Sequence, residues 1–342
     1  MKQVQYKVHT QQGVLLNANE SSKNLSAAIR KEIQDAIFDI EFNRYPDDAC
    51  QKLCEAYGNW IQVPADQILS GNGSDQHLGF LIGTFLGKNK KLLTLAPDFG
   101  MYDYYASSYE AQIVRYALDP LQAMDVDAFI RFGKQEKPQL VLFSNPNNPT
   151  GQFLDNEQIK KICKAFDCPV VIDEAYAEFA PDTCLSLLDV CPNLYVTRTL
   201  SKAFGLAGAR IGFLITSKAN MEAIRGNHVP YSVNSLSMKA AEIVLAHAAE
   251  FKPEIERIKK ERDVFLTKSY TSFSFSKSEA NFLLIQTSHI DKLLALFAQK
   301  GLSVRSYQQK NYCRVTIGTT QENQWIQEVL DAFEKEETYA MQ

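Results

Sequence analysis

"QLVLFSNPNNPTGQFLDNEQIKKICKAFDCPVVID" (residues 139–173) holds two short apolar runs on either side of a helix-like segment. The runs at 139–144 and 169–173 are apolar on both faces, which is typical of strands buried between two layers of helices. The segment at 155–166 begins with an aspartate that suits a helix N-cap and continues with helical periodicity. The stretch therefore predicts a strand–helix–strand unit with parallel strands.

The same alternation extends over the region from about residue 67 to 216. Further apolar runs lie at 91–96, 111–118, 193–199 and 210–216, and helix-like segments separate them. This pattern predicts the α/β fold class, with a mostly parallel, doubly wound sheet in a large domain.

The pattern changes after the last of these runs. Long helical stretches at 234–248 and roughly 253–270 are followed by strand-like runs and two more helices. This arrangement predicts a second, smaller α+β domain, joined to the first by helical connections. We expect the large domain at residues 40–225, and the small domain at residues 1–25 together with 233–342.

Composition and charge exclude several function classes. The 342 residues suffice for two cores, and a net charge of −4 without basic blocks gives no reason to expect a nucleic-acid partner. The longest apolar run, 78–87, is too short to span a bilayer, and the first residues lack the apolar core of a signal peptide. Seven scattered cysteines suit a reducing compartment, and Cys50 and Cys54 lack a second ligand pair, so no metal site is predicted. We expect a cytoplasmic protein.

Polar residues follow the predicted strands where those strands end, and doubly wound sheets bind ligands at this edge. "GNGSDQ" (71–76) can form an anion site from free N–H groups at a helix start, with the hydroxyl of Ser74 and the backbone of Asp75. The rigid loop "SNPNNPTG" (144–151) can hold the amide of Asn148 towards a ligand. Taken alone, either segment can also be an ordinary turn.

Three charged residues are expected at the same edge. Asp173 ends a buried strand, where a carboxylate is costly unless it meets a positive partner. Lys202 follows the strand at 193–199, and Arg210 comes eight residues later. A salt bridge between Asp173 and Lys202 would explain two of these charges. It would leave Arg210, the anion site and the asparagine loop without a role.

One ligand accounts for all of these features, namely pyridoxal 5′-phosphate, a planar aromatic cation with an aldehyde and a phosphate. Lys202 would hold the aldehyde as a Schiff base, and Asp173 would pair with the N–H of the ring. Tyr102 would stack on the ring, although an aromatic cluster is more often part of a core. Asn148 and Tyr176 would hydrogen-bond the ring hydroxyl oxygen. The phosphate would be held by Ser74, Asp75, Thr199, Ser201 and Arg210.

Ten short motifs, taken in order along the chain, resemble the fold-type-I pyridoxal-phosphate-dependent aminotransferases, and most closely the histidinol-phosphate aminotransferases. The motifs are "LNANE" (16–20), "NRYPD" (43–47), "GNGSD" (71–75), "GMYDYY" (100–105), "SNPNNPTG" (144–151), "DEAYAEF" (173–179), "RTLSKAFGLAGARIGF" (198–213), "VPYSVNSLS" (229–237), "SEANF" (278–282) and "CRVTIGT" (313–319). The resemblance spans nearly the whole chain, and it implies a homodimer active in histidine biosynthesis.

The resemblance also implies roles for residues outside the cofactor set. Arg314 would clamp the substrate α-carboxylate, a task that suits a planar guanidinium, and Arg305 would lie near a distal phosphate or carboxylate. Tyr45 would reach across a dimer interface to the cofactor phosphate of the neighbouring subunit. Asn19 and Glu20 would line the substrate pocket.

The implied reaction is ping-pong transamination between glutamate and imidazole-acetol phosphate, with Lys202 as general base. The chain departs from the family pattern after "NANE", at Gln76 and in "PYSVNS", and the first two departures touch the substrate side or its support. Alternatives therefore stay open. They are an aromatic-amino-acid aminotransferase, a threonine-phosphate decarboxylase, and the aminotransferase-like domain of a transcription regulator, for whose DNA-binding domain we expect no room before "LNANE".

Overall fold

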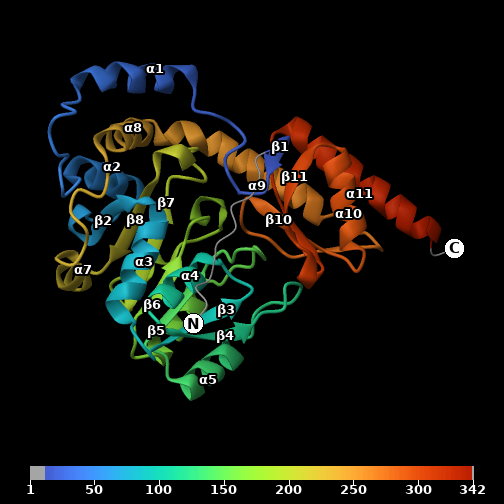
Figure 1. Ribbon diagram of the computed structural model, residues 1–342, viewed down its shortest axis with the longest axis horizontal. Helices are drawn as coiled ribbons and strands as arrows, with labels where there is room; N and C mark the ends of the chain where they lie inside the picture. The colour runs from blue at the N-terminus through green and yellow to red at the C-terminus, as the bar shows by residue number, and fades with distance from the viewer. Residues whose placement is uncertain (1–11, 341–342) are drawn as a thin grey trace.

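The computed structural model describes residues 12–340, which form two sheets lying next to each other (Figure 1). The larger sheet has the strand order β2-β8-β7-β6-β5-β3-β4. Its strands are β2 (Ile68–Asn72), β3 (Lys91–Ala96), β4 (Gln112–Ala117), β5 (Leu140–Ser144), β6 (Val170–Asp173), β7 (Leu194–Thr199) and β8 (Ile211–Thr216). Each apolar run expected to be a strand between 91 and 216 is one, within a residue or two at its ends. The predicted α/β class is confirmed.

β8 is the exception to the parallel arrangement, because it runs antiparallel to both β2 and β7. The neighbouring pairs from β7 to β4 are parallel. An antiparallel strand begins at the edge where its parallel neighbours end. Arg210, which directly precedes β8, therefore lies at the same edge as Asp173 and Lys202.

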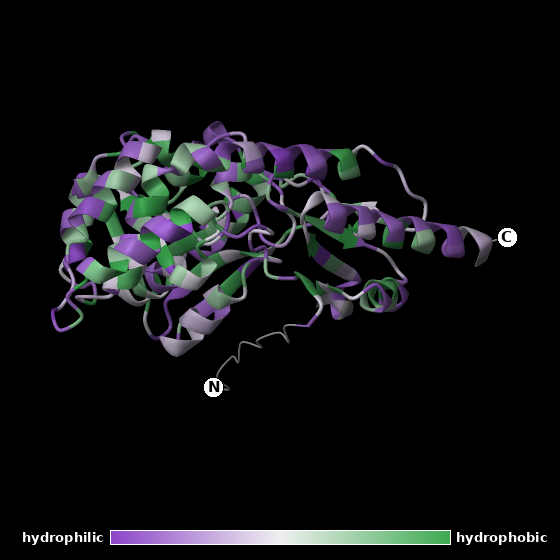
Figure 2. Ribbon diagram, turned by 90° about the horizontal axis from the view of Figure 1, so that it is seen from above, coloured by the Kyte–Doolittle hydropathy of each residue, from purple (hydrophilic) through white to green (hydrophobic). Residues whose placement is uncertain are grey.

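Helices cover both faces of this sheet, and their side chains form two separate cores. Alternate residues of β5 point to opposite sides, with Val141 and Phe143 in one core and Leu140 and Leu142 in the other. The surrounding helices are α2 (Gln51–Ile61), α3 (Gly73–Phe85), α4 (Met101–Ser108), α5 (Val126–Glu136), α6 (Asn156–Ala165), α7 (Lys218–Arg225) and α8 (Ser235–Ala246). α6 begins at the predicted aspartate, since Asp155 and Gln158 form a capping box. Figure 2 shows hydrophobic residues gathered inside these layers.

The second sheet has five strands in the order β1-β11-β12-β10-β9. These strands are β1 (Val14–Leu16), β9 (Ser274–Phe275), β10 (Phe282–Gln286), β11 (Leu302–Tyr307) and β12 (Tyr312–Thr316). The remaining helices are α1 (Ala27–Ala36), α9 (Lys252–Leu266), α10 (Ile290–Gln299) and α11 (Thr320–Ala340). β1 pairs in parallel with β11, so the N-terminal strand belongs to the smaller sheet. The exact domain limits stay a prediction.

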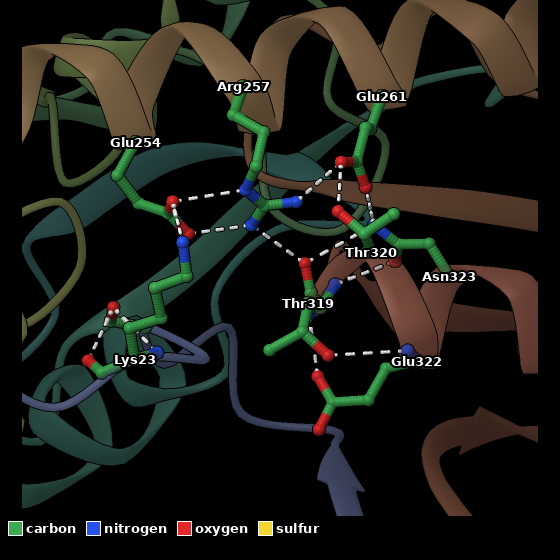
Figure 3. Close-up of polar contacts among 10 residues, drawn as sticks. Lys23, Glu254, Arg257, Glu261, Thr319, Thr320, Glu322 and Asn323 are labelled. Carbon is green, nitrogen blue, oxygen red and sulfur yellow. Dashed lines mark hydrogen bonds and ion pairs between the residues drawn. The ribbon is translucent and has the colours of Figure 1, made fainter.

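Polar contacts attach the segment after β1 to α9, and α9 to the loop after β12 (Figure 3). Lys23 forms an ion pair of 2.6 Å with Glu254, and Arg257 forms ion pairs of 2.6 Å with Glu254 and 2.8 Å with Glu261. Arg257 also donates to the carbonyl oxygen of Gly318 at 2.9 Å. Lys23 therefore ties the segment that leaves β1 to α9, and Arg257 ties α9 to the loop after β12. Among residues 12–340, no helix is long and apolar enough to cross a membrane.

Candidate active site

A cavity of about 590 Å³ lies between the carboxyl edge of the larger sheet and the smaller sheet. The larger sheet and its loops contribute most of the expected cofactor residues, and the segment after β1 joins β11 and β12 in closing the other side. Of the residues selected from the sequence, the cavity is lined by Glu20, Ser74, Asp75, Asn148, Asp173, Tyr176, Thr199, Ser201, Lys202, Arg210, Arg305 and Arg314. Segments more than 290 residues apart thus share one site, as the bond between Arg314 and the Asn17 carbonyl shows.

Lys202 projects into this cavity from the turn after β7. Its Nζ donates a hydrogen bond of 2.8 Å to the carbonyl oxygen of Ala18 and lies 5.9 Å from the centre of the Tyr176 ring. Burial, with the positive charge of Arg314 as a second cause, lowers the pKa of Lys202 to about 8. An amine with this pKa is partly neutral, and therefore nucleophilic, near physiological pH.

Asp173 ends β6 with a buried carboxylate. Its Oδ2 accepts from the Tyr102 hydroxyl at 2.9 Å, and its Oδ1 accepts from the Thr197 hydroxyl at 3.0 Å. Burial raises the pKa of Asp173 to about 6 in spite of both hydrogen bonds. Within residues 12–340 Asp173 has no ion pair, since Lys202 bonds the Ala18 carbonyl instead. The salt bridge between Asp173 and Lys202, which was the alternative interpretation of the sequence, is not formed in the structure. The carboxylate of Asp173 therefore has no cationic partner among these residues.

Tyr176 stands beside Lys202 with a buried ring. Its hydroxyl oxygen accepts from Asn19 Nδ2 at 2.9 Å, and its ring packs edge-on against Phe282. Burial raises the pKa of Tyr176 to about 12, so the phenol is neutral and can donate its proton to a hydrogen-bond acceptor.

Two arginines enter from the smaller sheet at directly opposed positions. Arg305 on β11 and Arg314 on β12 are Cα partners in an antiparallel pair, and both line the cavity. Like charges at such positions repel each other, so the pair favours an anionic ligand. Arg314 donates to Asn148 Oδ1 and to the carbonyl oxygen of Asn17, whereas its buried Nε has no partner among the described residues. This orphaned donor also fits an anion in the cavity.

An anion cradle forms where β2 leads into α3. The helix N-cap, Asn72, makes no side-chain cap, so its side chain leaves the first N–H groups of α3 available, and Ser74 and Asp75 of this turn line the cavity. Gly73 has φ +76°, and a Cβ there would come within 2.7 Å of Arg210 Nη2. Arg210 in turn donates to Asp75 Oδ2 at 2.8 Å. The cradle therefore needs a glycine, and it brings together N–H groups, a hydroxyl and a guanidinium.

Gln76 supports this cradle from behind. Its Oε1 accepts the backbone N–H of Asn72 at 2.6 Å, and it does not line the cavity. Gln76 is thus a structural support of the turn, and it has no contact with the ligand space.

Two hydroxyl groups also belong to the cavity wall. Those of Thr199 and Ser201 lie 2.9 Å apart, and both residues line the cavity.

Tyr102 does not line the cavity, contrary to the expectation that its ring faces the ligand. It lies in the first turn of α4 with 1% of its surface exposed, and its hydroxyl points to Asp173 instead of its ring facing the cavity. Phe99, three residues earlier and before the helix begins, lines the cavity. Which ring of this cluster reaches the cavity depends on where α4 begins, and the sequence pattern did not define that start.

Two other selected residues lie outside the cavity wall. Asn19 is fully buried behind Tyr176, so it does not line the pocket as expected. Tyr45 is 81% exposed and stacks on Tyr231 with ring centres 4.8 Å apart. Its expected reach towards a neighbouring subunit stays a prediction, since one chain is described.

The sequence reading also missed cavity residues. Asp98 lines the cavity and accepts the backbone N–H groups of Phe99 at 2.8 Å and Ser144 at 3.2 Å. Burial raises the pKa of Asp98. The signal was available, because Asp98 follows a buried strand in the same way as Asp173. Asn17 and Tyr307 were missed too, and they line the wall on the side of the smaller sheet.

Comparison with known proteins identifies the class of protein. The family model of the class I and II aminotransferases matches residues 11–333, and the chain belongs to this family. The histidinol-phosphate aminotransferase of Clostridium novyi (strain NT) is 36% identical over 315 residues, which cover 91% of this chain and 88% of that protein.

Two solved structures share the fold. The histidinol-phosphate aminotransferase from Sinorhizobium meliloti, in complex with pyridoxal-5′-phosphate, has a TM-score of 0.81 at 22% identity and covers 94% of this chain and 92% of its own. The L-threonine-O-3-phosphate decarboxylase from Porphyromonas gingivalis has a TM-score of 0.79 at 21% identity, with coverages of 94% and 99%.

The residues of the cavity fit pyridoxal 5′-phosphate. The unpaired carboxylate of Asp173 suits a protonated ring nitrogen, and the cradle at Gly73 suits a phosphate. The amine of Lys202, with its lowered pKa, suits an aldehyde. Each of the three chemical groups of the cofactor thus has a matching protein group at one edge of the sheet.

The lowered pKa of Lys202 leads to a direct prediction. In the protein freed of small molecules, labelling of Lys202 by an amine-selective reagent should rise with pH around a midpoint of about 8. The labelled form is the neutral amine, so labelling is lost as the pH falls below the midpoint. Replacing Arg314 by methionine removes a nearby positive charge and should raise the midpoint. Mass spectrometry of the Lys202 peptide measures the extent of labelling at each pH. A wild-type midpoint near the ordinary lysine value of about 10.4 would contradict the prediction.

Proposed function

We propose that this chain is a pyridoxal 5′-phosphate-dependent transaminase that exchanges the amino group of histidinol phosphate with 2-oxoglutarate, giving imidazole-acetol phosphate and glutamate. One observation carries the proposal. The cavity joins an amine of lowered pKa, a buried carboxylate without a cationic partner among the described residues, an anion cradle, and two opposed arginines. The Clostridium novyi relative, 36% identical over 91% of this chain, is named for that activity.

In the proposed complex, the cofactor supplies an aldehyde that bonds covalently to amines and a protonated ring that withdraws electrons from the substrate α-carbon. Lys202 is the residue that binds the aldehyde, and Asp173 accepts the ring N–H. Asn148 and Tyr176 face the ring hydroxyl, and we propose Phe99 in place of Tyr102 as the stacked ring. The phosphate is held by Ser74, the backbone at Asp75, Thr199, Ser201 and Arg210.

Tyr102 takes a second role in this proposal. Its hydroxyl donates to Asp173 Oδ2 and so holds that oxygen in place. Thr197 holds the other oxygen in the same way. Both bonds favour the ionised carboxylate and oppose the effect of burial, so Asp173 can accept a ring N–H near neutral pH.

Lys202 also handles the proton. Once its amine is free, Nζ takes the α-proton of the substrate and holds it until it is returned. A general base works best when its pKa lies near the working pH, and a value of about 8 meets this condition. The nearby charge of Arg314 favours the neutral, basic form of the amine.

The two arginines support substrates with strong anionic groups. Arg305 and Arg314 stand opposite each other on neighbouring strands, and a guanidinium can bind phosphate or carboxylate through paired N–H donors. One pocket can therefore accept the phosphate of histidinol phosphate in one half-reaction and a carboxylate of glutamate in the other. Glu20, which also lines the cavity, can accept a hydrogen bond from an imidazole N–H.

Substrate choice distinguishes this proposal from its rivals. Because a site built for a phosphate rejects an analogue that lacks one, kcat/KM for histidinol phosphate should exceed that for phenylalanine by about 100-fold or more. Replacing Arg305 by methionine should lower kcat/KM for histidinol phosphate by about tenfold or more, with a smaller effect for phenylalanine. Steady-state kinetics with 2-oxoglutarate provide the measurement. A preference for phenylalanine would favour an aromatic aminotransferase, and release of carbon dioxide from threonine phosphate would favour a decarboxylase.

We also propose that the chain forms a homodimer with shared active sites. Large apolar side chains lie exposed in two segments, at Phe38 and Phe42 before α2 and at Val229 and Tyr231 before α8. Tyr45 joins these segments by stacking on Tyr231. An apolar surface of this kind is typical of an interface, and a second copy would cover it with the same surface.

The homodimer proposal predicts the effect of a charge in this surface. Changing Phe38 and Phe42 together to aspartate should convert the protein to a monomer. Both side chains are exposed in the single chain and would be buried between the two copies of a dimer. Changing Val264 to aspartate is the matched control, since that side chain is 51% exposed on α9. Sedimentation velocity reads the mass. A wild-type protein that sediments as a monomer would refute the homodimer.

We propose the cytoplasm as the location. The seven cysteines, all within the described residues, are free thiols, and six of them are buried. Thiols without a disulfide framework are what a reducing compartment maintains.

A further inference from the structure

Asn19 has an unusual backbone conformation for a buried residue. It is fully buried between β1 and the cavity wall, and its φ is +55°, in the left-handed region. A side chain with a Cβ is disfavoured in this region, although asparagine tolerates it better than most residues. Residues held in this way often lie at functional sites, where surrounding contacts fix them.

Contacts from the smaller sheet hold Asn19 in place. Its backbone N–H donates to Thr316 Oγ1 at 3.1 Å, and its carbonyl oxygen accepts from Asn281 Nδ2 at 3.1 Å. Thr316 Oγ1 also lies 3.1 Å from Asn19 Oδ1. Both partners belong to the strand pair β10–β12 or directly precede it, so the conformation depends on that sheet.

The side chain of Asn19 acts on Tyr176. Its Nδ2 donates to the Tyr176 hydroxyl oxygen at 2.9 Å. Because the Tyr176 oxygen accepts this bond, its hydroxyl proton stays available for donation to another group. Tyr176 lines the cavity, so that group can be a ligand. Asn19 therefore sets Tyr176 as a donor to a ligand in the cavity.

The backbone of Asn19 acts on Lys202. The N–H and C=O groups of a trans peptide point in opposite directions. The N–H of the peptide between Ala18 and Asn19 is bonded to Thr316, so its carbonyl points the other way, where it accepts from Lys202 Nζ at 2.8 Å. A positive φ at Asn19 then lets the chain turn and place the side chain on Tyr176.

We propose that Asn19 is a positioning residue that acts on two groups of the cofactor site through separate bonds. Its side chain fixes the Tyr176 hydroxyl as a donor, and its left-handed backbone aims the Ala18 carbonyl at the Lys202 amine whenever that amine is free. Asn19 itself touches no ligand. This inference rests on the proposed function, since it concerns the residues that would hold the cofactor.

Two substitutions separate the two actions. Asn19→Gly removes the side chain but keeps the left-handed backbone, because glycine adopts positive φ without strain. Asn19→Ala removes the side chain and also disfavours that backbone. The difference between these variants therefore reports on the Ala18 carbonyl, and the difference between wild type and Asn19→Gly reports on the bond to Tyr176.

Asn89 provides a matched control. It is an exposed asparagine with φ +67° in the turn before β3, and it does not line the cavity. Asn89→Gly and Asn89→Ala repeat the same pair of changes at the same kind of backbone position. These variants show what the loss of a left-handed asparagine does by itself.

The first measurement is the rate at which pyridoxal 5′-phosphate, added to the apoprotein, bonds to Lys202. In that reaction the amine attacks the aldehyde carbon, and the carbonyl oxygen leaves as water, which gives a visible absorbance band. We expect the rate of this reaction to be at least about fivefold lower for Asn19→Ala than for Asn19→Gly. Asn89→Gly and Asn89→Ala should react at the wild-type rate. Equal rates for the two Asn19 variants would overturn the action on Lys202.

The second measurement is the equilibrium dissociation constant of the cofactor. Asn19→Gly and Tyr176→Phe should each weaken binding, by about fivefold, and the double variant should be no weaker than Tyr176→Phe alone. Fully additive effects would overturn the action on Tyr176. If Asn19→Ala does not fold, Asn19→Asp replaces it, since it keeps the contact with Thr316 but cannot donate to Tyr176. Wild-type binding by Asn19→Asp would then contradict the inference.

These outcomes separate the inference from the proposed function. If wild-type apoprotein forms no bond with the cofactor, the proposed function fails and the inference fails with it. If wild type binds the cofactor and the Asn19 variants behave like the Asn89 variants, the inference alone is wrong.

Discussion

The buried carboxylate of Asp173 is the interaction on which the rest of the site depends. A carboxylate at the end of a buried strand is stable only if it is hydrogen-bonded and meets a positive charge. Tyr102 and Thr197 supply the hydrogen bonds, but no cation among the described residues pairs with Asp173. Lys202 lies in the same cavity, and its pKa is lowered instead of being raised by a salt bridge. The positive partner therefore has to come from a ligand, and the cradle and the amine define which ligand fits.

The smaller sheet completes the site through the segment that leaves β1. The carbonyl oxygens of two consecutive residues point to different cations, that of Asn17 to Arg314 and that of Ala18 to Lys202. The same segment is attached to α9 by Lys23 (Figure 3). One short stretch of backbone thus links the group proposed for the chemistry to the group proposed for substrate binding. A shift of this stretch would change both together.

Much of the fold and of the site could be predicted from the sequence, because local sequence patterns define the strands and the residues that follow them. The apolar runs predicted the strands, and the rule that ligands bind where parallel strands end brought Ser74, Asn148, Asp173 and Lys202 together. The errors have physical reasons. Whether Phe99 or Tyr102 faces the cavity depends on where α4 begins, and the left-handed turn at Asn19 depends on contacts with a sheet formed almost 300 residues later. The opposition of Arg305 and Arg314 depends on strand register, which local pattern does not define.

The central claim is that the amine of Lys202 forms the covalent bond to the cofactor, next to the acid that receives the ring nitrogen. Reduction of the protein loaded with pyridoxal 5′-phosphate by borohydride, followed by peptide mass spectrometry, tests it most directly. The account predicts one modified lysine, Lys202, and loss of the modification when Asp173 is replaced by alanine under limiting cofactor. A modification at another lysine, or none at all, would contradict it.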